Sequence, residues 1–132
     1  MNEQGTTTEP VAEAAPIDKP RDSARIAAQN DLFRNSLGST SLLNGMVIAT
    51  AGVVARGERF HAEAMQAVAG FSVFTEDNDP HGERDFGAFE IDGVRLFWKI
   101  DLYDPDLRYG SEDPANPKAT HRVLTVMLAS EY

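Results

Sequence analysis

The sequence predicts a single α+β domain, in which two N-terminal helices pack on a mostly antiparallel sheet with a hairpin near its centre. Two segments in the first half repeat apolar residues at helical spacing. An Asp-Gly pair in the second half joins two segments of alternating polarity, which is typical of a β-hairpin. The 132 residues show no internal repeat and suit one domain with a real core, expected over residues 23–132.

Residues 1–22 are expected to be a disordered tail. Pro10, Pro16 and Pro20 stand there among Thr, Glu and Ala residues, and no hydrophobic period is present. The segment also lacks the apolar core of a signal peptide.

The composition narrows the class of protein. Cysteine is absent, which excludes disulfides, thiolate nucleophiles and cysteine-ligated zinc. No segment approaches the roughly 20 consecutive apolar residues that a membrane span needs. We therefore expect a cytoplasmic protein that does not associate with membranes.

The first helix is expected to run from Ser23 to about Leu37. Asp22 and Ser23 can cap its start, and Gly38 can end it. Its apolar face would carry Ile26, Asn30, Phe33 and Leu37. Asn30-Asp31 in mid-helix is unusual, since neither residue favours that place, and either an exposed position or a polar neighbour would explain the pair.

A strand, a second helix and a short strand are expected next. Residues 46–54 are apolar on both faces, which favours a strand covered on both sides. The second helix is expected over about 58–69, between Gly57 and Gly70, and residues 71–75 are expected to be a short strand. The buried stripe of this helix would comprise Phe60, Ala64, Ala67 and Val68, with Phe71 following.

The Asp92-Gly93 turn sets the register of the hairpin. A two-residue turn places Glu90 opposite Arg95 and Gly87 opposite Trp98, where the glycine leaves room for the indole. One face is then apolar: Phe89, Ile91, Val94, Leu96, Trp98, Ile100 and Leu102. A slip by one residue would destroy both the charge pair and the apolar face.

The last part of the chain is expected to be a loop and a strand. Residues 104–119 contain Pro105, Pro114 and Pro117 and are too rich in proline for a helix. Residues 122–129 favour a strand, and a final helix turn is the alternative, because so short an apolar segment is not decided by its period.

The acidity of the chain is concentrated in one segment. The net charge is −9, and residues 76–113 hold 12 acidic and 4 basic side chains, which accounts for −8 of it. Such a segment opposes binding to nucleic-acid phosphates. It is compatible with a basic protein partner, with cation binding, and with a merely solvated acidic surface.

The densest acidic cluster occupies residues 76–85 and is the candidate site. Its side chains include the carboxylates Asp77, Asp79, Glu83 and Asp85 together with Asn78 and His81. Carboxylates are ligands for Mg²⁺, Mn²⁺ or Ca²⁺, but His81 and Ala88 stand where an EF-hand loop needs oxygen ligands. In the alternative interpretation, Asp79 to Gly82 is a turn closed by its own side chains and needs no ligand.

The hairpin register brings further polar residues to this candidate site. Asp85 is expected opposite Ile100 and hence near Lys99 and Asp101, as a structural ion network or an acid–base site. Arg84, Lys99, Arg108 and Arg122 are the candidate partners of the acids, and His81 and His121 are candidate bases. The sequence lacks a nucleophile elbow, a phosphate-binding glycine loop and a zinc-helix motif.

The second half of the chain resembles a bacterial family, the domain of unknown function 3768. The motifs that carry the resemblance are Phe74-Thr75, Asp77 to Pro80, Gly82-Glu83, Asp85 to Gly87, Phe97 to Asp101, Tyr103-Asp104, Gly110-Ser111, Asp113-Pro114, Arg122 to Thr125, Met127 to Ala129 and Glu131-Tyr132. Weaker similarity covers Asn30-Asp31 and Phe33-Arg34, so the resemblance spans about residues 28–132. Arg84 and Leu102 depart from the pattern, which often has histidine and tyrosine there. The resemblance implies a small accessory protein of plasmids and other mobile elements, and it carries over no particular activity.

These observations lead to two functional hypotheses. The first is a protein-binding module whose acidic face engages a basic host protein, with Phe97 and Tyr103 as apolar anchors, unless a helix covers that face. The alternative is a divalent-metal-dependent enzyme of nucleotide or phosphoester chemistry that uses the carboxylates between Asp77 and Asp85. Arg122 and Lys99 belong to the candidate binding residues in either case.

Overall fold

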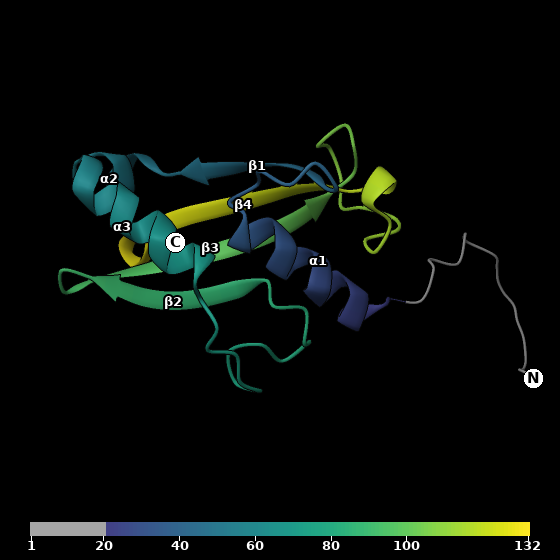
Figure 1. Cartoon of the computed structure of the whole chain (residues 1–132), viewed down its shortest axis with the longest axis horizontal. Coiled ribbons are helices and arrows are strands. Elements are labelled where there is room, and N and C mark those ends of the chain that lie inside the picture. The colour runs from purple at the N-terminus through teal and green to yellow at the C-terminus, as the bar shows by residue number, and fades with distance from the viewer. Residues whose placement is uncertain (1–20) are drawn as a thin grey trace, which may run out of the picture.

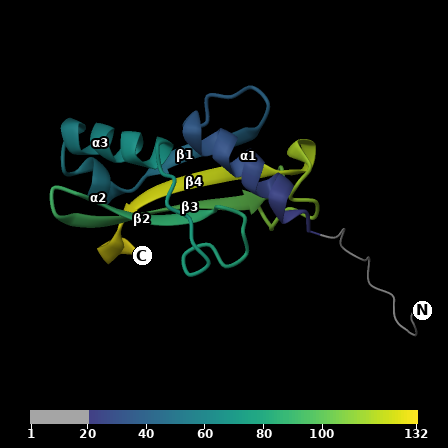
Figure 2. The same cartoon turned by 60° about the horizontal axis from the view of Figure 1, so that its bottom comes forward.

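A four-stranded mixed sheet carries its helices on one face and leaves most of the other face open (Figures 1 and 2). The structure is a computed structural model, which describes residues 21–132. The strands are β1 (Asn44–Ala49), β2 (Phe86–Ile91), β3 (Val94–Tyr103) and β4 (His121–Leu128). The helices are α1 (Ser23–Asn35), α2 (Ala51–Val54) and α3 (Glu58–Ala69), with 3₁₀ turns η1 (Pro117–Ala119) and η2 (Ala129–Glu131).

The sheet confirms the predicted α+β class. Its strand order is β1-β4-β3-β2, with two antiparallel pairs and one parallel pair, β1 with β4. β3 is an inner strand and β2 an edge strand, so only one strand of the hairpin is central. None of the helices in residues 21–132 has the length and apolar character to cross a membrane.

The predicted hairpin register is confirmed at every pair. Glu90 lies opposite Arg95, and Gly87 lies opposite Trp98. Asp92 and Gly93 have φ angles of +53° and +76°, the left-handed pair that a tight two-residue turn requires. A side chain at Gly87 would collide with the indole of Trp98, so this glycine does make room for the ring.

The core lies between the inner face of the sheet and the two long helices. From the sheet come Leu96, Trp98, Leu124 and Val126, which are fully buried. From α1 and α3 come Phe33, Phe60, Ala64 and Val68. Both predicted helices are confirmed, and α1 begins as expected with the Asp22 carboxylate accepting a hydrogen bond from the Arg25 amide at 3.1 Å.

The strand predicted over residues 46–54 is wrong in its second half, and the strand predicted over residues 71–75 is wrong as a whole. β1 ends at Ala49, and α2 follows where the strand was expected to continue. The cause is distant: the Glu131 carboxylate accepts hydrogen bonds from the Thr50 hydroxyl (2.6 Å) and the Gly52 amide (2.9 Å), which starts the helical turn.

Residues 71–75 form no strand, because their aromatic rings enter the core instead of a ladder. Phe71 and Phe74 lie edge-on to Trp98, with ring centroids 5.4 and 6.2 Å away. Residues 122–129, by contrast, are almost wholly strand, and only η2 at their end turns helical.

The face of the sheet opposite the helices is open over β2 and β3. Figure 2 shows α1 and α3 on one side of the sheet and the C-terminal η2 turn on the other. That turn brings Tyr132 against Phe97 and Phe86, with ring centroids 5.4 and 6.1 Å apart. The predicted anchor Phe97 is therefore covered by neither α1 nor α3, and the ring of Tyr132 contacts it on this face.

Candidate functional site

The acidic loop (residues 75–85) is closed by its own side chains. The Asn78 side chain accepts a hydrogen bond from the Thr75 amide (2.7 Å) and donates one to the Val73 carbonyl (2.8 Å). The Asp79 carboxylate accepts from the Arg84 amide at 2.9 Å, and the Gly82 amide closes the turn on the Asp79 carbonyl. The interpretation of this segment as a self-capped turn is thus confirmed.

Glu83 is the buried carboxylate of this loop, with 3% of the residue exposed. Its oxygens accept hydrogen bonds from Arg21 Nε (2.6 Å) and Arg21 Nη2 (2.8 Å), and from the Ser23 hydroxyl (2.9 Å). Burial raises the pKa of Glu83, but the bonds from Arg21 and Ser23 and the charge of Arg21 outweigh it, so the pKa is lowered overall. Its charged partner, Arg21, lies at the end of the predicted tail. The four partners predicted for the acids were instead Arg84, Lys99, Arg108 and Arg122.

Asn30 links Glu83 to Arg122 inside the domain. Its amide nitrogen donates to the Glu83 carbonyl (2.9 Å), and its amide oxygen accepts from Arg122 Nε (2.9 Å). Both Asn30 and Arg122 are fully buried. The unusual mid-helix asparagine is therefore explained by polar neighbours rather than by exposure.

The guanidinium group of Arg122 donates its hydrogen bonds to neutral side-chain amides. Its Nη2 donates to the Gln29 side-chain oxygen at 2.9 Å, and its Nη1 has no hydrogen-bond partner among residues 21–132. Burial lowers the pKa of Arg122 to about 10. Because its contacts join β4 to α1, this arginine belongs to the frame of the fold and not to an open site.

Arg34 and Arg84 clamp the two ends of the acidic loop to α1. Both guanidinium groups bond to the Asp31 carboxylate, at 2.8 and 3.0 Å, and both lie over the ring of Phe74. Arg34 also donates to the carbonyl of Val68, in the last turn of α3, and to that of Phe71 just beyond it. The loop is consequently anchored at both ends while Asp77, between them, is exposed.

Lys99 and Asp101 pair on the open face of β3, at 3.0 Å, and about a third of each side chain is exposed. Asp85 lies opposite Ile100 as expected, through a hydrogen bond from the Ile100 amide. Its charged neighbours, however, include Glu83, Asp79, His81 and Arg21, and burial raises its pKa. Since opposite residues share a face, Asp85 follows Ile100 inward, whereas Lys99 and Asp101 point outward, so the expected three-residue cluster is not assembled.

The exposed acids do not converge on a common point. Among residues 21–132, no three His, Asp or Glu side chains form a group that could hold a metal ion. His81 is exposed in the acidic loop, and His121 lies at the start of β4.

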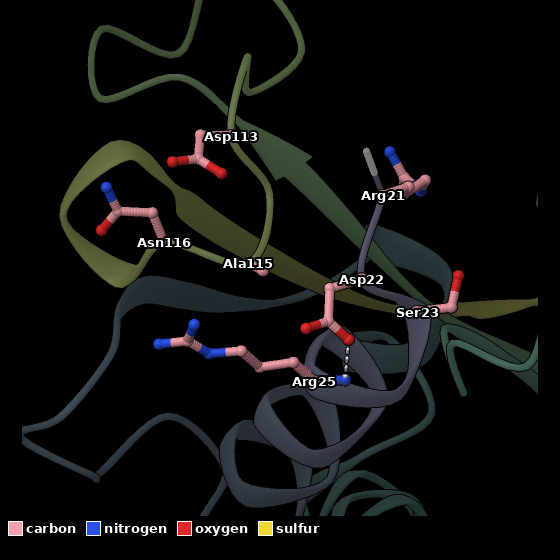
Figure 3. Close-up of a pocket in the computed structure, with 7 residues that line it drawn as sticks. All are labelled: Arg21, Asp22, Ser23, Arg25, Asp113, Ala115 and Asn116. Carbon is pink, nitrogen blue, oxygen red and sulfur yellow. Dashed lines mark hydrogen bonds between the residues drawn. The ribbon is translucent and has the colours of Figure 1, made fainter. Parts of the chain in front are cut away.

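A polar cavity of about 730 Å³ lies at the start of α1 (Figure 3). Its lining is Arg21, Asp22, Ser23 and Arg25 on one side and Asp113, Ala115 and Asn116 on the other. Figure 3 shows Asp22 bonded to the Arg25 amide, so the helix start already has its own anionic cap. Charges of both signs line the cavity, which gives it no preference for a cation or an anion.

A more apolar groove of about 780 Å³ runs beside β2, and we refer to it as the β2 groove. Its lining comprises Phe71, Val73, Asp77 and Asn78 from the segment after α3, Phe86, Ala88 and Phe89 from β2, Arg95 and Phe97 from β3, and Tyr132. Two of the predicted site residues, Asp77 and Asn78, line it, and so does the predicted anchor Phe97. Tyr103, the other predicted anchor, does not.

Sequence reasoning missed most of this groove. Val73 and Tyr132 are 65% and 74% exposed, and both come from parts of the chain where no strand or helix fixes their place in advance. The only available signal was the run of aromatic residues on both sides of the acidic loop.

Comparison with known proteins identifies one matching family model. The family model described as a protein of unknown function (DUF3768) matches residues 49–131, which is more than half of the chain and includes the acidic loop, the hairpin and β4. The weaker similarity at Asn30 to Arg34 lies outside that match. No curated protein and no solved structure matches the chain. The chain belongs to the DUF3768 family, as the resemblance of its second half indicated.

Proposed function

We propose that this protein is a protein-binding module that receives a basic partner in the β2 groove. The observation that carries the proposal is the groove itself. Aromatic side chains of β2 and β3 and Tyr132 line it beside the exposed acidic Asp77, along the edge strand β2. Exposed aromatic residues in a concave site are the usual anchors of protein interfaces.

The charge around the groove supports a basic partner. Asp77 is exposed at one wall, its neighbour Glu76 is also exposed, and Glu90 is exposed on β2. The single cation in the lining, Arg95, lies opposite Glu90 in the strand register and stacks over the ring of Phe97 at 5.6 Å. A lysine or arginine of a partner would gain attraction here, while a nucleic acid would be repelled.

The family resemblance supports the setting of this activity. A small acidic accessory protein of a bacterial plasmid or other mobile element would meet basic host proteins in the cytoplasm, and occupying such a protein would alter its action. The alternative of a divalent-metal enzyme gains no support from the geometry, since the carboxylates of Asp79 and Glu83 are bonded within the fold.

Selection from a displayed peptide library tests the proposal directly. The whole protein is panned against random peptides of about ten residues, the upper length of ordinary strands. We expect the enriched peptides to carry lysine or arginine beside aliphatic or aromatic residues. Their affinities are then measured by fluorescence anisotropy for the wild type and for Tyr132→Ser.

Tyr109→Ser is the matched control, because Tyr109 is 70% exposed against 74% for Tyr132 but lies in the loop beyond the far end of β3. We expect about tenfold weaker binding to Tyr132→Ser and unchanged binding to Tyr109→Ser. Enrichment of no peptide, or equal binding by both variants, would show that the groove is not a protein-binding site.

A further inference from the structure

We infer that the partner enters the β2 groove as an extended basic segment that pairs with the free edge of β2 and becomes a fifth strand of the sheet. This inference rests on the proposed function and specifies the conformation and chemistry of the partner. It is carried by three features: unpaired backbone groups on β2, a groove that reaches both faces of that strand, and acids along its rim.

The hairpin geometry determines which backbone groups of β2 are free. In a two-residue hairpin the residues that flank the turn, Ile91 and Val94, exchange hydrogen bonds, and bonded pairs then recur at every second position. The bond from the Ile100 amide to the Asp85 carbonyl continues this series. The amides and carbonyls of Phe86, Ala88 and Glu90 therefore point away from β3, along the outer edge of the sheet.

The neighbouring segment does not close this edge. Within residues 21–132, no backbone hydrogen bond reaches the amides or carbonyls of Phe86, Ala88 or Glu90 from outside the sheet. The carbonyl of Val73, which lines the opposite wall of the groove, and the amide of Thr75 nearby are both bonded to the Asn78 side chain. These two backbone groups of the segment after α3 thus already have hydrogen-bond partners within that segment. The outward backbone groups of β2 have no backbone partner there.

The groove extends to both faces of β2. Phe86 and Ala88 belong to the open face of the sheet, whereas Phe89 belongs to the face that carries the core, and all three line the groove. An added strand would place alternate side chains against these two sets of residues. Main-chain pairing with pockets for alternate side chains is how sheet edges recognise peptides.

The rim selects basic side chains for this strand. Asp77 lines one wall and Glu90 lies on the edge strand itself, and both are exposed. Charged residues often protect sheet edges from pairing with other proteins. Here the exposed charges near the edge are mainly acidic, so they repel a second acidic copy of this chain and attract a basic segment.

N-methylation of the peptide tests strand pairing. Each residue of the tightest peptide from the panning is N-methylated in turn, and its affinity for the wild-type protein is measured. We expect about tenfold weaker binding at every second position within the paired stretch and near-normal binding between them, because only alternate amides would bond to β2. Hydrogen exchange on the complex should show new protection at the amides of Phe86, Ala88 and Glu90.

Charge recognition is tested with Asp77→Asn and Glu90→Gln, and Asp106→Asn in the loop after β3 serves as the control. The first two should weaken binding of the same peptide severalfold and reduce its salt dependence, and the control should do neither. Groove-dependent binding without the alternating pattern, or with protection confined to β1, overturns strand addition and leaves the protein-binding function standing. A failure to enrich any groove-dependent peptide overturns both.

Discussion

At the scale of single residues, the least ordinary group is Arg122, a buried cation that has no carboxylate partner within residues 21–132. Its hydrogen bonds go to the neutral side-chain oxygens of Asn30 and Gln29, at 2.9 Å each. A buried charge that loses a hydrogen-bond acceptor still bears the full free-energy cost of its removal from water. Loss of any member of this network should therefore destabilise the folded protein. Arg122 is one of the candidate binding residues of the sequence analysis, and in the structure its contacts lie inside the domain.

Replacing Asn30 by alanine should destabilise the domain by about 2–4 kcal/mol. The change leaves Arg122 Nε buried without its acceptor and also removes the bond to the Glu83 carbonyl. Urea-induced unfolding of the two proteins measures the difference. Asn44→Ala is the control, since Asn44 is exposed, and it should cost less than about 0.5 kcal/mol. Equal stability of the two variants would contradict the role assigned to this network.

At the scale of elements, the outcome of each prediction depended on whether its cause was local. The hairpin could be predicted in full because Asp92 and Gly93 specify the turn and the alternation of neighbouring residues specifies the faces. The helix α2 could not, because the group that starts it, Glu131, is separated from Thr50 by most of the domain. Residues 71–75 have the composition of a strand, but packing of Phe71 and Phe74 on Trp98 prevails over that propensity.

The same distinction explains the candidate site. The turn at Asp79 to Gly82 was predictable from its own residues. The partners of Glu83 and Arg122 were not, since Arg21 and Asn30 come from a different part of the chain. Asp85 lies opposite Ile100 as predicted, but the alternation of faces turns it inward with Ile100 and away from Lys99, which points outward.

Gly87→Ala should destabilise the hairpin and its packing by about 1–3 kcal/mol. A β-carbon at Gly87 would overlap the Trp98 indole and lie 2.7 Å from the ring of Phe71, so both rings must shift. Thermal unfolding followed by tryptophan fluorescence reports this directly, since the protein has one tryptophan. At Gly70 the nearest atom would be 3.5 Å away and φ is −92°, so Gly70→Ala should change stability much less. A larger loss at Gly70 would contradict the explanation for Gly87.

At the scale of the whole molecule, the Arg21–Glu83 pair joins the residues before α1 to the acidic loop, and so ties together two distant parts of the domain. Its effect on stability depends on pH. Because the pKa of Glu83 is lowered on folding from the ordinary value of 4.5, its ionised form favours the folded state. The stabilisation is present above about pH 4.5 and is lost as the pH falls through the lower pKa of the folded protein.

Glu83→Gln should therefore reduce stability at pH 7 and flatten its decline in acid. We expect the free energy of unfolding, measured in urea between about pH 3 and pH 7, to fall more steeply below pH 4.5 in the wild type than in the variant. Asp85, with its raised pKa, contributes in the opposite sense and is present in both proteins. The exposed Glu112 provides the control: Glu112→Gln should keep the wild-type acid slope. A parallel loss of stability in all three proteins would contradict the assignment.

The parallel pairing of β1 with β4 has a kinetic consequence. Asn44 lies opposite His121, so the first strand acquires its neighbour only after the helices, the acidic loop and the hairpin have been synthesised. Contacts so distant in sequence slow folding, because the entropy of closing the intervening chain is lost before the pairing stabilises it. During synthesis, β1 and its apolar side chains Met46 and Ile48 would wait unpaired. A nascent chain that has not yet reached β4 holds a hairpin and a helical segment, but no strand that can join β1 to them.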